Sequence, residues 1–224
     1  VAAAKKTMVD DGLAIPVNKV MSLIGEFKNF EDFHFHIYKN YFLSDLLLKV
    51  NRYKALSEEI ALSQGKSIIW KTEGEKIIVD TEKYGPFVNS LVHVFRNLID
   101  HGIESEDERV EKNKLKSGTI TVQSKVVGEN FELRIQDDGR GIDHKKIKKQ
   151  LIKNGLKSED DFNGHKADQI IQYIFLPNFS TKESISELSG RGIGMDAVKE
   201  EVQKLGGEIS VSSKVEEGTS FIME

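Results

Sequence analysis

The segment from Pro86 to Glu104, PFVNSLVHVFRNLIDHGIE, constrains the fold more than any other stretch of the sequence. On an ideal helix each residue turns by about 100°, which gathers apolar side chains on one side and polar side chains within an arc of about 140° on the other. The apolar side holds Leu91, Val94, Phe95 and Leu98, and the polar side holds His93, Arg96, Asn97, Asp100 and His101. This pattern predicts an amphipathic helix whose apolar side faces a core.

The polar side of this predicted helix is rich in groups that bind ligands. A solvated helix face usually carries Lys and Glu, whereas this one offers two imidazoles, a guanidinium, an amide and a carboxylate. Such groups suit phosphates and hard cations. Amphipathic helices with polar faces are common, so an ordinary solvent-exposed face is the alternative interpretation.

Composition narrows the class of protein. The chain has 224 residues, 38% hydrophobic and 30% charged, which suffices for one well-buried domain with an appendage. Its 32 basic and 36 acidic residues favour neither a nucleic-acid partner nor direct membrane contact. The absence of cysteine excludes disulfides and thiolate metal sites and is compatible with the cytoplasmic location that we expect. Because the chain stops in a strand-like segment, TSFIME, we expect it to be part of a longer protein.

The first 62 residues predict a tail followed by helices. Residues 1–13 are small and polar without a clear period, which is typical of a tail or linker. Residues 14–62 show helical apolar spacing near Ile15 and again from Leu46 to Leu56, which predicts two helices joined near Asn29 to Asn40. Their aromatic residues fit a helical hairpin, a homodimer seam or packing onto the neighbouring domain. We expect His34 and His36 to be packed or exposed imidazoles and not a metal or phosphoacceptor site.

Residues 63–224 predict a sheet covered by helices. Strands are expected at Lys66 to Trp70 and Lys76 to Val79, as a hairpin around TEGE, and at GTITVQSKVV, NFELRIQD, GGEISVSS and GTSFIME. Helices are expected at His144 to Asn154, Lys166 to Phe175 and Met195 to Leu205, and a charged loop at Ser105 to Ser117. Strands and helices segregate along the chain, so the expected fold class is an α+β sandwich, a mixed sheet with helices on one face.

Two glycine-rich loops are candidates for ligand binding. Asp137-Asp138-Gly139-Arg140-Gly141 ends a predicted strand, where glycines let the backbone approach a ligand and a carboxylate accepts hydrogen bonds. Gly190-Arg191-Gly192-Ile193-Gly194-Met195 precedes a predicted helix, whose N-terminus can hold a polyphosphate. Alone, the first loop could be a simple turn and the second is a weak signal. The second loop is neither a Rossmann fingerprint nor a Walker loop.

The order of these motifs is more specific than any one of them. A polar helix with Asn, then Asp-x-Gly-x-Gly, Gly-x-Gly-x-Gly and a late Gly-Thr resembles the Bergerat ATP-binding fold of gyrase, Hsp90, histidine kinases and MutL. Within that superfamily, HVFRNLIDHGIE, DDGRGID, IFLPNFST and SGRGIGMDAVK resemble the kinase domain of CheA-type chemotaxis histidine kinases, over about Tyr53 to Glu224. Upstream, NKVMSLIGEF resembles the start of the CheA dimerisation hairpin, but the segment after it is too short and aromatic for that hairpin.

The resemblance implies a site for ATP or ADP with Mg²⁺. It implies that Asn97 coordinates Mg²⁺ and that Asp137 accepts from the adenine amine with support from Thr219. It further implies that His93, Asp100 and His101 lie along the phosphates and ribose, that Gly139 and Gly141 make room for the base, and that Lys146 reaches the phosphates. The remaining implied nucleotide contacts come from the phenylalanine box, Phe179, Ser180 and Thr181, and from the lid, Gly190, Arg191, Gly192, Ile193, Gly194 and Met195.

The resemblance also implies the reaction, transfer of the γ-phosphate to a histidine on a separate phosphotransfer domain and onward to a response regulator. Hydrolytic relatives carry a glutamate base four residues before the Mg²⁺ asparagine, and this sequence has His93 there. We therefore expect phosphoryl transfer with His93, Asn97 and Lys146 as catalytic residues. Neither His34 nor His36 lies in a phosphotransfer-like sequence, so the acceptor is expected elsewhere and this chain should not phosphorylate itself. An ATP-dependent conformational switch or pseudokinase is the alternative.

Overall fold

The computed structural model describes residues 29–177, 179 and 194–224. The chain forms two compact units, Val1–Ser44 and Asp45–Glu224. In the first unit, the described residues form helix α2 (Phe30–Ile37), a π-helical turn (Tyr38–Phe42) and the start of strand β1 (Leu43–Asp45). The predicted tail and the predicted helix near Ile15 lie outside the described residues.

Helix α2 occupies the stretch in which the sequence pattern predicts a connection between helices. That prediction is wrong because Asn29 caps a helix, its side-chain oxygen accepting a hydrogen bond from the Asp32 amide at 2.8 Å. His34 is exposed and its ring stacks on that of Tyr38, with 6.4 Å between the ring centroids. This is one of the environments expected for the imidazoles of this segment.

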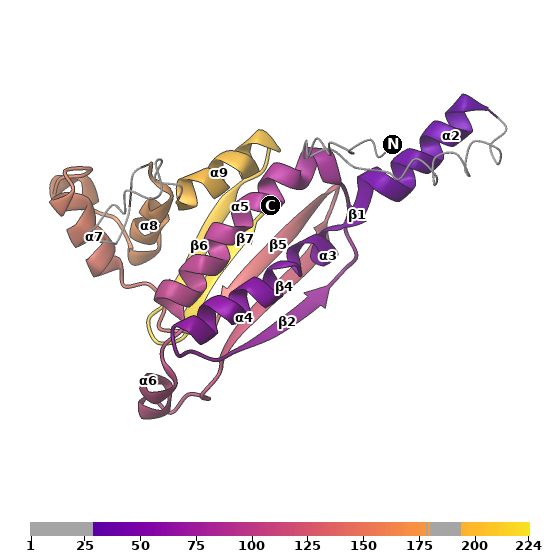
Figure 1. The fold of residues 1–224 in the computed structure, drawn as a ribbon. Helices are drawn as coiled ribbons and strands as arrows, with labels where there is room; N and C mark the ends of the chain where they lie inside the picture. The colour runs from indigo at the N-terminus through magenta and orange to yellow at the C-terminus, as the bar shows by residue number, and fades with distance from the viewer. Residues whose placement is uncertain (1–28, 178, 180–193) are drawn as a thin grey trace, which may run out of the picture. The chain divides into compact units, whose positions relative to one another are not determined.

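The second unit is built on a five-stranded mixed sheet in the order β2-β4-β5-β7-β6 (Figure 1). The strands are β2 (Ile68–Gly74), β4 (Gly118–Val127), β5 (Asn130–Asp137), β6 (Ile209–Lys214) and β7 (Gly218–Met223). β2 and β4 run parallel, and the other neighbours pair antiparallel. The four strands from β4 onward were predicted, the first two of them from their alternating pattern, and the α+β class with a mixed sheet is confirmed.

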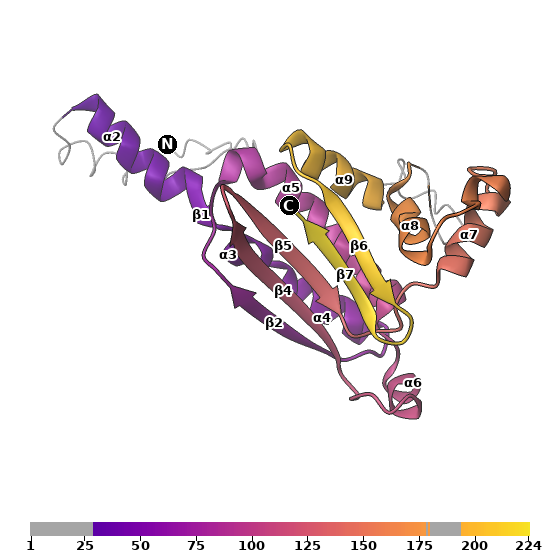
Figure 2. The same ribbon diagram turned by 180° about the vertical axis from the view of Figure 1, so that it is seen from behind.

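One face of the sheet is covered by helices α3 (Leu46–Val50), α4 (Tyr53–Ser63), α5 (Thr81–Asn97) and α9 (Met195–Lys204), as Figures 1 and 2 show. Side chains alternate across a strand, so each strand has one buried side. Ile120 and Val122 of β4 and Leu133 and Ile135 of β5 are fully buried in the resulting core. Among the described residues of the second unit, no helix covers the opposite face (Figure 2).

Helix α5 is the central helix and contains the amphipathic segment. It begins after Asp80, whose side chain accepts from the amides of Glu82 and Lys83. Phe95 lies against Tyr53 of α4 and Trp70 of β2, with ring centroids 5.3 and 5.0 Å away. The predicted apolar side, Leu91, Val94, Phe95 and Leu98, is buried. Beyond α5 the chain continues as a π-helical turn, Leu98–Gly102, a form that often occurs at functional sites.

Three further predictions about the elements are wrong. The expected hairpin around TEGE is absent, because β2 runs through Gly74 and pairs in parallel with β4, while β3 (Ile78–Asp80) lies outside the five-stranded sheet. The apolar residues from Leu46 to Leu56, which predict one helix, are divided between two helices, α3 and α4. The expected loop from Ser105 to Ser117 contains helix α6 (Glu106–Glu111), which begins with a capping box between Ser105 and Glu108.

The described residues between β5 and α9 form a smaller cluster beside α9 (Figure 1). It contains α7 (His144–Lys153), a 3₁₀ turn (Asp160–Phe162), α8 (Ala167–Ile171) and a second 3₁₀ turn (Gln172–Phe175). The Gln172 side chain joins this cluster to β6 by hydrogen bonds to both the carbonyl and the amide of Val211, at 2.7 and 3.1 Å. Within residues 29–177, 179 and 194–224, none of the helices has the length and hydropathy of a membrane span.

Candidate functional site

Asp137 is a buried carboxylate at the end of β5. The residue is 7% exposed, and its Oδ1 accepts a hydrogen bond from the Gly139 amide at 2.7 Å. Its Oδ2 is buried without a hydrogen-bond partner among the described residues. Burial raises the pKa of Asp137 to about 7, although the Gly139 hydrogen bond opposes the shift. The unpartnered Oδ2 could accept from a ligand, and the role of Asp137 as an acceptor stays a prediction.

Thr219 lies directly across from Asp137 on the neighbouring strand. The register of β5 and β7 pairs Asp137 with Thr219, so the two side chains lie on the same face of the sheet. Thr219 Oγ1 is 3.1 Å from Ser213 Oγ, and Ser213 in turn accepts from the Ile142 amide at 2.8 Å. The structure thus brings together the Asp-x-Gly and Gly-Thr motifs, which are far apart in the sequence.

Gly139 and Gly141 are required by the protein's own backbone. A Cβ at Gly139 would lie 2.2 Å from the carbonyl oxygen of Gly102, where the loop passes the π-helical turn. Gly141 has a positive φ of 68°, and a Cβ there would lie 2.2 Å from the Lys214 carbonyl oxygen. Close packing of the protein on itself therefore accounts for both glycines, in addition to any space that they leave for a base.

Asn97 and His93 lie one turn apart at the C-terminal end of α5. Asn97 is half-buried, and its side chain makes no hydrogen bond within the described part of the chain. His93 is half-buried as well, and burial together with the nearby Arg96 charge lowers its pKa, against the influence of Asp196 on α9. His93 is therefore a neutral imidazole at neutral pH.

The π-helical turn places Asp100 beside α4. Asp100 Oδ1 accepts from the Gln64 side chain at 2.7 Å, and Lys66 Nζ donates to the neighbouring Ile99 carbonyl at 2.5 Å. His101 is exposed on the same turn. These positions adjoin the end of α5, and their expected contacts with phosphate or ribose stay predictions.

The other expected nucleotide residues belong to α7, α9 and the segment between them. Lys146 is exposed on α7, and Phe179 is half-buried against the core of the smaller cluster. Gly194 caps α9, and the Met195 side chain is buried in the main core, which leaves its backbone as the part available to a ligand. Ser180, Thr181, Gly190, Arg191, Gly192 and Ile193 lie outside the described residues.

Comparison with known proteins decides the family. Residues 88–224 match a family model described as histidine kinase-, DNA gyrase B-, and HSP90-like ATPase. The chain belongs to this ATPase family. A gliding motility regulatory protein of Myxococcus xanthus is 38% identical over 165 residues, 74% of this chain and 21% of that protein. Chemotaxis protein CheA of Borreliella burgdorferi is 38% identical over 171 residues, 76% of this chain and 20% of that protein.

These relatives confirm the resemblance to CheA-type kinases, and this ATPase domain spans about a fifth of their length. Among solved structures, the mycobacterial sensor histidine kinase MprB is similar, with a TM-score of 0.49 and 18% identity over 81% of this chain and 95% of that one.

The ATPase domain also contains a buried charge cluster that the sequence analysis missed. Arg109 of α6 is 1% exposed and pairs with Glu104 at 3.1 Å and with the Asp138 carboxylate at 3.1 Å. Lys114 pairs with Glu104 at 2.9 Å and donates to the carbonyls of Asp138 and Gly139. Burial opposes ionisation of Glu104, yet the hydrogen bond from Lys114 and the two positive charges hold its pKa below the usual value. The capping box of α6, Ser105 to Glu108, was the sequence signal for this element.

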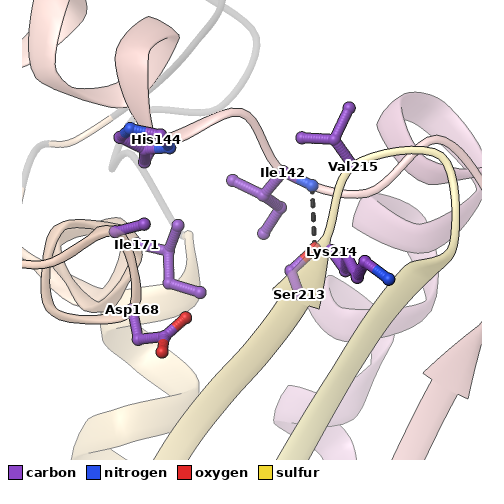
Figure 3. A pocket seen from close by; sticks show the side chains of 8 residues that line it. Ile142, His144, Asp168, Ile171, Ser213, Lys214 and Val215 are labelled. Atoms are coloured by element: carbon purple, nitrogen blue, oxygen red, sulfur yellow. Dashed lines mark hydrogen bonds between the residues drawn. The ribbon is translucent and has the colours of Figure 1, made fainter.

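A cavity of about 350 Å³ opens beside the loop after β5, between α8 and the turn that joins β6 to β7 (Figure 3). Ile142 and Ile171 form apolar walls, and His144, Asp168 and Lys214 supply polar groups. None of the residues expected to bind the nucleotide lines it. The cavity therefore adjoins the candidate site without containing its acceptor groups.

Asn97 fits a metal ion only in combination with a ligand. Within the described residues, no group of three or more His, Cys, Asp or Glu side chains could hold a metal. An amide oxygen is a suitable ligand for Mg²⁺, which usually keeps several waters and binds phosphate oxygens. The residues present thus suit a Mg²⁺ ion that arrives with a nucleotide.

Proposed function

We propose that this ATPase domain binds ATP with Mg²⁺ and transfers the γ-phosphate to a histidine on a separate phosphotransfer domain, which then supplies a response regulator. The observation that carries the proposal is the unpaired, buried Oδ2 of Asp137, opposite Thr219 on the adjacent strand. A buried acceptor without a partner suits an N–H donor such as the exocyclic amine of adenine. The similarity to CheA proteins supports a kinase rather than another ATP-binding class.

The end of α5 provides the groups for the phosphates. Asn97 would hold Mg²⁺ through its side-chain oxygen, and Mg²⁺, when bound, neutralises charge on the phosphates. His93 stands where hydrolytic relatives carry a glutamate base, and burial keeps the pKa of this imidazole below its usual value. The glutamate base for water attack is thus replaced in this chain, which favours transfer to an external nucleophile.

The remaining assignments are part of the same proposal. Lys146 and the residues Asp100 and His101 would lie along the phosphates and ribose. The lid and phenylalanine box would close over the triphosphate through Phe179, Ser180, Thr181, Gly190, Arg191, Gly192, Ile193, Gly194 and Met195. Homodimerisation through the N-terminal helices and a cytoplasmic location also belong to this proposal.

The proposal is tested by following the γ-phosphate of labelled ATP. The domain is incubated with ATP and Mg²⁺, alone and with a purified phosphotransfer domain from the full-length protein or a CheA relative. We expect label only on the added domain, in an acid-labile bond, and none on this chain. A phosphotransfer domain with its acceptor histidine replaced by glutamine is the control.

The outcomes separate the candidate functions. Label on the intact phosphotransfer domain and not on the control supports a histidine kinase that acts in trans. Tight ATP binding without any transfer would contradict the kinase proposal and favour a nucleotide-dependent switch. Failure to bind ATP at all would contradict both.

A further inference from the structure

The peptide bond between Asp138 and Gly139 is held from both sides. Its N–H group donates to Asp137 Oδ1 at 2.7 Å. Its carbonyl oxygen points the opposite way, because the peptide is trans and planar, and accepts from Lys114 Nζ at 3.0 Å. Lys114 Nζ also donates to the Gly139 carbonyl at 2.7 Å. One ammonium group thus holds two successive carbonyls of the loop that presents Asp137.

Lys114 is itself fixed by buried charges. Its Nζ pairs with Glu104 Oε1 at 2.9 Å, while Glu104 Oε2 pairs with Arg109 at 3.1 Å. The side chains of Glu104 and Arg109 are 0% and 1% exposed. Arg109 also reaches the Asp138 carboxylate at 3.1 Å, and that carboxylate accepts from the Thr119 amide at 2.8 Å. The loop after β5 is therefore tied to α6 and β4 by the same group of charges.

A buried charge cluster of this kind is not explained well by stability alone. Moving charges out of water costs several kcal/mol per ion, and buried ion pairs often do no better than apolar residues of similar volume. What this cluster does provide is a single orientation for the Asp138–Gly139 peptide. That orientation decides which oxygen of Asp137 is occupied by the protein and which is left for a ligand.

We propose that Lys114, seated on the buried Glu104–Arg109 pair, is a positioning residue for Asp137. It orients the Asp138–Gly139 peptide so that its N–H group occupies Oδ1 and leaves Oδ2 to accept from the base of the nucleotide. Lys114 does not touch the nucleotide and acts through one peptide plane. The inference rests on the proposed function, because that function gives Asp137 its ligand.

The test compares Lys114→Met with Lys116→Met, since Lys116 is an exposed neighbour on the same segment. Isothermal titration calorimetry measures the affinity of each variant for ATP with Mg²⁺ and for inorganic tripolyphosphate, which lacks the base. We expect Lys114→Met to weaken ATP roughly tenfold, as for loss of a charge-assisted hydrogen bond, and to leave tripolyphosphate affinity near that of the wild type. Lys116→Met should change neither.

A double-mutant cycle separates positioning from general support of the fold. If Lys114 acts only through Asp137, Lys114→Met should cause no further loss of ATP affinity in an Asp137→Asn background. Additive losses, or an equal loss of ATP and tripolyphosphate affinity, would overturn the inference. Lys114→Ala, which also removes the donor, replaces Lys114→Met if circular dichroism shows that the latter does not fold.

The two proposals fail in different ways. Wild-type protein that does not bind ATP would overturn the proposed function and this inference together. ATP binding that depends on Asp137 but responds to Lys114→Met no more than to Lys116→Met would overturn this inference alone.

Discussion

Asp137 shows at the scale of one residue how a proposed binding site opposes stability. The carboxyl pKa is about 7 in the folded protein against an ordinary value of 3.8, because burial disfavours the charged form. The folded state therefore binds a proton more tightly than the unfolded state. This contribution to stability is fully present below pH 3.8 and is lost as the pH rises through about 7.

We predict that Asp137→Asn stabilises the ligand-free domain, and more so at high pH. The amide has no charge to bury, so the gain in the free energy of unfolding should grow between pH 5 and pH 8, to at most about 4 kcal/mol. Urea unfolding of both proteins at the two pH values measures it. An equal difference between the proteins at both pH values would show that burial of this charge is not the cause.

The pKa of His93 shifts in the opposite direction to that of Asp137, because the charged form of an imidazole is the protonated one. Burial lowers the pKa of the imidazole, and the neighbouring Arg96 lowers it further. The same half-buried end of α5 therefore disfavours a proton on His93, while burial at the end of β5 favours one on Asp137. Burial therefore shifts each group towards its uncharged form.

At the scale of elements, α5 links the core to the site. Phe95 contacts Tyr53 and Trp70, so one ring joins α5 to α4 and β2. Asn97 and His93 project from the same helix, and their position depends on this packing. The helix and its apolar side were predictable because Leu91, Val94, Phe95 and Leu98 recur at helical spacing. Its start was not, because α5 begins at Thr81, ahead of the predicted segment, and includes Pro86.

We predict that Phe95→Ala destabilises the domain by roughly 3–5 kcal/mol, the usual cost of removing a buried aromatic ring. The fluorescence of Trp70, the single tryptophan, reports urea unfolding directly because its ring lies 5.0 Å from that of Phe95. Leu62→Ala on α4 is the control, since Leu62 is 78% exposed and should change stability little. Similar losses in both variants would contradict the assigned core.

Two elements were not predictable from local patterns. β2 was expected to fold back on the next segment, but its partner is β4, whose pairing begins with Ile68 opposite Gly118. A parallel register over such a separation leaves no signal in the turn sequence. α6 has only six residues and a charged composition, so its apolar period is absent and only the capping box of Ser105 and Glu108 marks it.

At the scale of the whole molecule, the site is assembled from segments that the sequence separates widely. The motif order predicted Asp137, Thr219 and Asn97, and the structure places the first two opposite each other on β5 and β7. The contacts of Lys114 with the Asp138 and Gly139 carbonyls could not be predicted, because they depend on how α6 packs at the end of β5. Periodicity identifies elements, whereas such contacts require their relative placement.

The measurement that tests the central claim most directly is the affinity for ATP, with and without Mg²⁺, of the wild type, Asn97→Ala and Asp137→Asn. We predict that Asn97→Ala loses the increase in affinity that Mg²⁺ gives, because the proposed metal ligand is gone, and keeps the metal-free affinity. Asp137→Asn should lose roughly tenfold or more under both conditions, because the acceptor for the base is altered. ATP affinity unchanged in both variants would contradict the account.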